Sequence, residues 1–207
     1  MESAAAATKT ITAITKAAPG VFTATAHGYS NGDYIVLDID GMYQLDGKVV
    51  RVCNVATDTF QAEGPSGGTG IDTTSYDTFS SGTASKLTFG TSITTATSMS
   101  GTGGDFDFID VTTIHSNVKA QIPGLANPIT YTFDNLWDIS DSGQIAMKSA
   151  TDSQLQKAFK FTFGTGGPIM VFSGYVGFTG APGGNAQDKV TSSAVVTAFG
   201  RPTYYSS

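Results

Sequence analysis

The sequence predicts an all-β protein with one short helix. Charged residues make up only 14% of the 207 residues, while 25 are glycine, and such a composition is typical of many strands joined by turns. Several segments alternate apolar and polar residues with a period of two, as strands with one buried face do. Turn dipeptides separate these segments closely. The three observations together favour antiparallel sheets in a β-sandwich or partial barrel.

The first 85 residues predict a short arm followed by a small module. Residues 1–8 lack strand signals and are expected to form a flexible N-terminal arm. Residues 9–85 are dense in strand and turn signals, so we expect a small β-barrel module there. In it, a strand over residues 34–39 would place Ile35, Leu37 and Ile39 on one face, and residues 49–55 form a second strand-like run. A glycine-rich loop over residues 64–70 precedes the boundary near residue 85.

Residues 86–207 are expected to form a second domain, an antiparallel β-sandwich. A single helix is predicted over residues 140–150, with Ser140 or Asp141 capping its first turn. Residues 164–168 contain glycines and a proline between two apolar runs, which predicts a hairpin turn. The alternating segments, each expected to be a strand, are residues 105–108, 129–138, 158–163 and 194–199.

The charge balance argues against a nucleic-acid-binding protein. The formal net charge is −6, whereas a protein that holds DNA non-specifically must neutralise phosphates with basic residues. Residues 1–85 carry nine acids and four bases, and residues 86–207 carry eight acids and seven bases. No apolar run approaches the length of a membrane-spanning helix, so no membrane partner is expected.

No motif in the sequence supports an enzyme or a cofactor. Residues 64–68 match the nucleophile pattern G-x-S-x-G around Ser66, but loop flanks favour a flexible linker. His27 and His115 fall in different halves and are expected to be surface or loop residues, which excludes a shared catalytic or zinc site. Cys53 is the one cysteine and is expected to be a buried free thiol.

A run of acidic residues resembles a calcium site only superficially. Asp105, Asp107 and Asp110 stand at close spacing, but Phe106 and Phe108 alternate with them, which favours a strand with one wet face. We therefore predict no metal and no catalytic residue. Long, weakly charged strands favour pairing with another chain, so assembly is the expected class of function.

The order of several segments resembles the tail tube proteins of long-tailed bacteriophages. The resemblance covers residues 86–207. It implies a structural virion protein of the phage tail, assembled in the host cytoplasm as homohexameric rings that stack into a hollow tube and conduct DNA during genome ejection. It also implies, as partners, further copies of the chain, the tape measure, tail terminator and tail-tip proteins, and DNA in transient passage without specific binding. The segments that carry it are residues 107–119, 122–128, 130–134, 141–144, 170–178, 183–191 and 195–203.

The N-terminal residues resemble a different family. Residues 11–33, with their Ala-His-Gly-Tyr and Asn-Gly-Asp steps, are similar to a small β-barrel module named after the first catalytic-cysteine half-domain of ubiquitin-activating enzymes. The resemblance implies no ubiquitin chemistry, because Cys53 matches no catalytic cysteine motif. It implies an accessory module added to the tube domain.

The tail tube resemblance implies two groups of functional residues. The segment from Asp110 to Gly124 is long and polar, and in the tube family such a loop reaches neighbouring subunits. Three acids are expected to face the lumen because they alternate with aromatics that we expect in the core: Asp105, Asp107 and Asp134. The expected inter-subunit contacts are Val111, Thr112, Thr113, Ile114, His115, Pro123, Gly124, Gly200, Arg201 and Pro202.

Two other readings remain open at this point. The chain could be another virion component, such as a capsid decoration or tail-tip protein, whose N-terminal module binds glycans through Tyr29, Tyr34 and Tyr43, since aromatic faces suit sugar rings. It could also be an esterase that uses Ser66. The first is tested by glycan binding to residues 1–85, and the second by the effect of Ser66→Ala on a measured activity.

Overall fold

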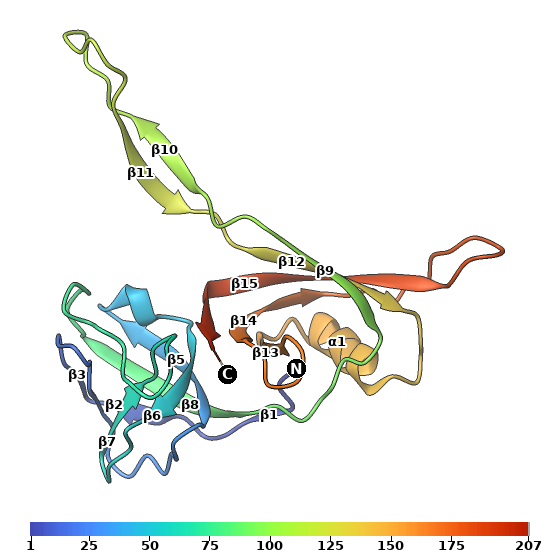
Figure 1. Ribbon diagram of the computed structural model, residues 1–207, viewed down its shortest axis with the longest axis horizontal. Helices are drawn as coiled ribbons and strands as arrows, with labels where there is room; N and C mark the ends of the chain where they lie inside the picture. Colours follow the sequence, from blue (N-terminus) through green and yellow to red (C-terminus); the bar gives the residue numbers. More distant parts are fainter. Residues whose placement is uncertain (207) are drawn as a thin grey trace.

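The computed structural model describes residues 1–206, which form three antiparallel sheets and one α-helix. Figure 1 shows the N-terminal sheet beside a longer C-terminal sheet, with a hairpin that projects away from both. The predicted mostly-β fold with a single helix is confirmed. Within the described residues no sheet closes into a barrel, so the small barrel predicted for the N-terminal module is an open sheet.

The N-terminal sheet has eight short strands. Their order is β1-β8-β5-β6-β7-β4-β3, and β2 also pairs with β8. A 3-10 turn, η1 (Tyr43–Leu45), joins β5 to β6. The strands are β1 (Ala4–Ala5), β2 (Lys9–Ile11), β3 (Ala13–Ile14), β4 (Phe22–Thr23), β5 (Tyr34–Asp40), β6 (Val49–Cys53), β7 (Thr59–Ala62) and β8 (Ser81–Thr88).

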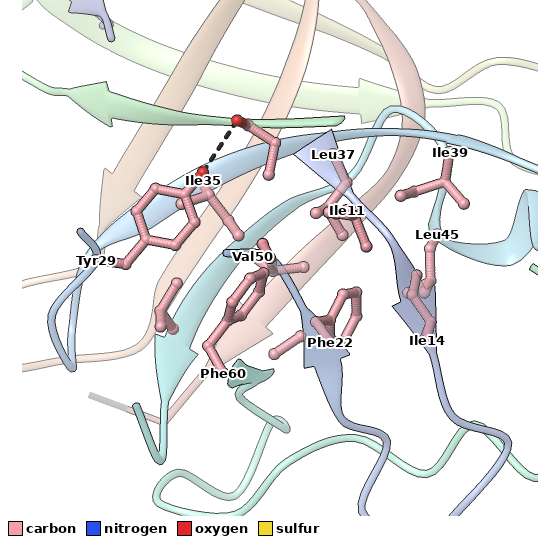
Figure 2. Close-up of a cluster of buried hydrophobic side chains, with 14 of the residues drawn as sticks. Ile11, Ile14, Phe22, Tyr29, Ile35, Leu37, Ile39, Leu45, Val50 and Phe60 are labelled. Atoms are coloured by element: carbon pink, nitrogen blue, oxygen red, sulfur yellow. Dashed lines mark hydrogen bonds between the residues drawn. The ribbon is translucent and has the colours of Figure 1, made fainter. Parts of the chain in front are cut away.

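The core of this sheet follows the alternation in the sequence. Every second residue of β5 is buried, so Ile35, Leu37 and Ile39 all point inward, as predicted. Figure 2 shows these side chains facing Phe22 and Phe60 from the opposite strands. The two phenylalanine rings stack with centroids 5.1 Å apart. The dry interior that results holds the module together by apolar burial.

Residues 1–8 are not the loose arm that the sequence suggested. Met1 and Glu2 are buried, and β1 pairs with β8. The Glu2 carboxylate accepts a hydrogen bond of 2.9 Å from the backbone N–H of Ala158, and the Glu2 N–H donates to the Ala158 carbonyl. Residues 1–8 therefore connect the two sheets through contacts with β8 and β13. The sequence could not predict this, because both partners are distant along the chain.

The C-terminal sheet has five strands and carries the helix on one face. Its order is β13-β14-β15-β12-β9. Apolar side chains of α1 (Ser142–Ser153) pack against β14 in the second buried cluster, which includes Met147, Phe172 and Val196. The strands are β9 (Ala96–Thr102), β12 (Thr130–Leu136), β13 (Lys157–Thr162), β14 (Ile169–Gly177) and β15 (Thr191–Tyr205).

The predicted capping residue begins the helix. The Asp141 carboxylate accepts a hydrogen bond of 2.9 Å from the backbone N–H of Gln144, which satisfies one of the free donors of the first turn. The hairpin turn expected at residues 164–168 lies between β13 and β14.

A third cluster joins the two sheets. It contains Val49 and Leu87 from the N-terminal sheet, and Val171 and Tyr205 from the C-terminal one. The Ser173 hydroxyl donates a hydrogen bond of 2.8 Å to the carbonyl of Gly47 at the same junction. Strand β8 runs through the position near residue 85 where we expected a boundary, so the chain passes between the sheets without a linker there.

The third sheet is a separate hairpin of β10 (Phe106–Asp110) and β11 (Gln121–Ala126). It leaves the body between β9 and β12 and projects outward (Figure 1). Phe106 and Phe108 were expected to face a core, but they are 41% and 62% exposed. That expectation was wrong because the hairpin has no second layer within the described chain.

Candidate subunit-interaction surfaces

The hairpin carries an unusual concentration of exposed apolar side chains. At its far end Ile114 is 96% exposed, and Leu125 near its base is 87% exposed. Isolated exposed apolar residues are common, whereas eight on one hairpin are typical of an interaction surface. The set comprises Phe106, Phe108, Ile109, Val111, Ile114, Val118, Ile122 and Leu125.

The predicted contact residues fall in two places. Residues 111–115 lie in the exposed turn of the hairpin, and Pro123 and Gly124 lie in β11. Gly200, Arg201 and Pro202 lie instead in β15, beside the N-terminal sheet. There Gly200 has a φ of +75°, and an added Cβ would stand 3.1 Å from the carbonyl oxygen of Asp46. Gly200 therefore serves the junction within one chain.

Arg201 connects the base of the hairpin to the body. Its guanidinium carbon lies 5.3 Å from the centroid of the Phe106 ring. This cation–π contact holds the first residue of β10 beside β15. Sequence reasoning missed this pairing, because the two residues are distant in the chain.

The C-terminal sheet has two edge strands of different character. All seven residues of β9 are exposed, and β9 pairs with β12 alone. The other edge strand, β13, is partly covered, since Glu2 occupies both backbone groups of Ala158. A free edge presents unpaired N–H and C=O groups to another chain.

The face of this sheet opposite α1 is rich in hydroxyl groups. Residues in register on neighbouring strands share a face, and Asp134 lies opposite both Ser98 and Ser193. We call nine residues of this face, from β9, β12 and β15, the hydroxyl-rich face, and none of these nine side chains is cationic. Its residues are Ser98, Ser100, Thr102, Thr130, Thr132, Asp134, Ser193, Val195 and Thr197.

The three acids expected in a lumen do not gather in one place. Asp134 is exposed on the hydroxyl-rich face, where its carboxylate accepts a hydrogen bond of 2.7 Å from Ser98. Asp105 and Asp107 lie at the base of the hairpin, and Asp107 accepts a hydrogen bond of 3.2 Å from the Asn127 amide. Only Asp134 stands on a broad sheet surface.

The residues that sequence motifs suggested as catalytic lie in different parts of the fold. Ser66 lies in the loop after β7. His27 was expected to be a surface or loop residue; it lies outside the strands, but it is buried, with its ring 5.4 Å from that of Phe60. His115 is exposed at the end of the hairpin. Cys53 is a buried free thiol, as predicted, and burial raises its pKa. Among residues 1–206 no cluster of potential metal ligands occurs.

The aromatic platform proposed for glycans is absent from the module's surface. Tyr29 is buried, and its hydroxyl donates a hydrogen bond of 2.9 Å to the Ala84 carbonyl. Tyr34 packs edge-on against Phe89 at the junction. Only Tyr43 of the three is largely exposed, at 72%. The glycan-binding expectation based on these residues was therefore wrong, because two of the rings are needed for packing.

Comparison with known proteins decides the family. The family model described as phage tail tube protein matches residues 40–207. The chain belongs to this family. Tail tube proteins are structural components of the phage virion, so this chain is a component of the virion tail and not an enzyme. No curated protein matches the chain.

The family match is longer than the resemblance seen in the sequence. It begins at Asp40, the last residue of β5, and includes β6, β7 and β8, so three of the eight strands of the N-terminal sheet lie fully within the match. The described residues contain no helix with the length and apolar character needed to cross a membrane. The resemblance of residues 11–33 to a separate module stays a prediction.

Sequence reasoning predicted a loop over residues 110–124, whereas the ends of this segment are paired in the two-stranded ribbon; its role in subunit contacts stays a prediction. Pro123 argued against a strand, because proline cannot donate to a ladder. The structure accommodates it in a two-stranded ribbon, where one edge of each strand is free. The signal that could have revealed the ribbon is the apolar content on both sides of the polar turn, at Phe106, Phe108, Ile122 and Leu125.

Proposed function

We propose that six copies of this chain form a ring, and that stacked rings form a hollow tail tube through which phage DNA passes. The observation that carries the proposal is the projecting hairpin with its exposed apolar side chains. A two-stranded ribbon of this kind is at best marginally stable by itself in water. Contact with further copies would bury its apolar surface and fix its direction.

The edge strands of the C-terminal sheet support lateral pairing. The free edge of β9 offers backbone donors and acceptors over seven residues. Pairing with a second copy satisfies these groups, and pairing around a closed ring leaves no free lateral edge. The inner sheets of the six subunits would then join into one continuous β-barrel around the lumen.

The hydroxyl-rich face supports a channel lining. A conduit for DNA must not retain phosphates, so cations are unfavourable there. That face carries seven hydroxyl side chains, Val195 and one acid, Asp134, and it lies opposite the face covered by α1. We infer that Asp134 faces the lumen. Asp105 and Asp107 lie at the base of the hairpin, so nothing observed supports the same role for them.

The remaining partners follow from the proposed tube. A tube has two ends and a hollow interior, so we propose that the tail terminator and tail-tip proteins contact its end rings. We also propose that the tape measure protein occupies the lumen before DNA enters. Passage of DNA would be transient and without specific binding.

Negative-stain electron microscopy of the purified full-length protein tests the proposal. We expect six-fold rings or tubes, and a protein that stays monomeric at every concentration would contradict it. The double variant Ile114→Ser/Val118→Ser is expected to abolish assembly without loss of folding, since both side chains are exposed. Leu155→Ser is the matched control, because Leu155 is 55% exposed at the end of α1, away from the hairpin.

A further inference from the structure

A large cleft lies where the N-terminal sheet, the base of the hairpin and β15 meet. Its volume is 630 Å³. Two of its lining side chains are strongly exposed apolar groups, Tyr43 at 72% and Leu125 at 87%. Lys48 and Arg201 line the same cleft. The cleft therefore combines apolar walls with two cationic groups.

The two cations of the cleft are not matched by acids within the chain. Among residues 1–206 neither Lys48 nor Arg201 forms an ion pair. Burial lowers the pKa of Lys48, and the nearby charge of Arg201 lowers it further. Asp46 also lines the cleft, but its carboxylate accepts a hydrogen bond of 3.1 Å from the Ile39 N–H. An acid brought by another molecule would relieve the repulsion between the cations.

The hairpin has the complementary character at its opposite end. Ile114 and Val118 are 96% and 77% exposed there. Asp110 begins the turn, and its partner Lys119 is 3.5 Å away in an exposed ion pair, which contributes little to stability. Residues 110–119 carry one acid, Asp110, and one base, Lys119, so the turn can offer the cleft exposed apolar side chains and one carboxylate.

The hairpin cannot enter the cleft of its own chain. Phe106 and Leu125, at the hairpin's base, are part of the cleft wall. The five residues of β10 place the turn roughly 15 Å beyond that base. Figure 1 shows the turn pointing away from the N-terminal sheet. Only the hairpin of a second copy can bring its turn to this cleft.

We propose that the end of the hairpin from a second copy binds in this cleft, with Ile114 and Val118 against Tyr43 and Leu125, and with Asp110 facing Arg201. The inference rests on the proposed self-assembly and names the receiving surface. The contact is head-to-tail, because one copy contributes the end of its hairpin and the other contributes its cleft. Such contacts repeat from copy to copy and generate rings or stacks.

Cross-linking in the assembled full-length protein tests the contact directly. The double variant Ile114→Cys/Tyr43→Cys, treated with a short bis-maleimide, is expected to give a ladder of covalent multimers. Each single variant is a control and is expected to give no ladder. The native Cys53 is buried and should not react. If the double variant forms normal tubes or rings but gives no covalent multimers, the proposed docking site is contradicted while the proposed function is not.

Charge reversal gives a second, independent readout. Arg201→Glu is expected to raise the protein concentration needed for half-assembly about tenfold, because two acids then face each other. Asp110→Arg in the same chain is expected to restore assembly. Lys189→Glu, an exposed reversal in the loop before β15, is the matched control. Arg201→Glu with unchanged assembly, or no rescue by Asp110→Arg, would contradict the proposed pairing. A wild-type chain that never assembles would instead contradict the proposed function itself.

Discussion

Tyr205 and Arg51 hold the last strand of the chain against the N-terminal sheet. The Tyr205 hydroxyl accepts a hydrogen bond of 2.7 Å from the backbone N–H of Arg51. The Arg51 guanidinium carbon also lies 4.6 Å from the centroid of the Tyr205 ring. Tyr205 is 1% exposed within the cluster that joins the two sheets. The body that presents the hairpin therefore depends on contacts between the last strand of the chain and β6.

Two substitutions of Tyr205 separate the stability contributed by its ring from that contributed by its hydroxyl group. Tyr205→Ala removes a buried ring and should lower the free energy of unfolding by about 3–5 kcal/mol. Tyr205→Phe keeps the ring but leaves the Arg51 N–H without its acceptor, so a loss of about 1–3 kcal/mol is expected. Denaturant unfolding measures both. Equal losses for the two variants would show that the ring itself contributes little.

Gly103 at the root of the hairpin should resist substitution. It has a φ of +92°, and an added Cβ would lie 2.3 Å from the Pro128 carbonyl oxygen. Gly103→Ala should therefore combine backbone strain with a clash and cost roughly 2–4 kcal/mol. Gly28→Ala is the control, because its φ is +70° but nothing lies within 4 Å. Thermal unfolding should show a clearly smaller loss for Gly28→Ala, and equal shifts would exclude the clash.

The capping carboxylate of α1 should contribute measurable stability. Asp141→Ala removes the acceptor for the Gln144 N–H and also the bond from the Thr94 hydroxyl, so a loss of about 1 kcal/mol is expected. Asp141→Asn keeps a capping oxygen and should lose less. Chemical denaturation followed by circular dichroism compares the two. If both variants match the wild type, the cap is not stabilising.

The buried pair of Glu63 and Arg51 predicts acid sensitivity. Burial by itself would raise the pKa of Glu63, but hydrogen bonds from Arg51 and the Gly68 N–H outweigh it and hold the pKa below its usual value of 4.5. The pair therefore stabilises the fold above that value, and the contribution is lost as pH falls through the lowered pKa. Between about pH 5 and pH 3, wild type should lose more stability than Glu63→Gln. Parallel pH profiles would show that Glu63 does not titrate with a lowered pKa.

A cation in the proposed lumen should slow DNA without affecting the fold. Asp134 is exposed, and among residues 1–206 its carboxylate accepts a hydrogen bond from Ser98 alone. Asp134→Lys should leave thermal unfolding nearly unchanged, and tubes should still form. Phage particles with this variant are expected to eject DNA more slowly, because phosphates are then attracted to the wall. Asp188→Lys in the loop before β15 is the control. Ejection at the wild-type rate would place Asp134 outside the lumen.

Local sequence signals were reliable wherever local forces decide the structure. Ile35, Leu37 and Ile39 alternate in the sequence and point inward in β5. Asp141 caps α1, as its position before the helix predicted. Expectations failed where a residue's surroundings come from distant parts of the chain. Met1 is buried by the C-terminal sheet, and Phe108 is exposed because no layer covers the hairpin.

The sequence by itself determined the β class, the single helix, the exclusion of catalytic chemistry and the resemblance to tail tube proteins. These conclusions follow from composition, from period-two alternation and from the order of short segments. All three can be read from the sequence without knowing which distant segments pair. Only the tertiary structure decided that β10 and β11 form a projecting ribbon, that Tyr205 closes the junction, and that Lys48 meets Arg201 in a cleft. Such relationships depend on which distant segments pair, and that choice is made by burial and hydrogen bonding across the whole chain.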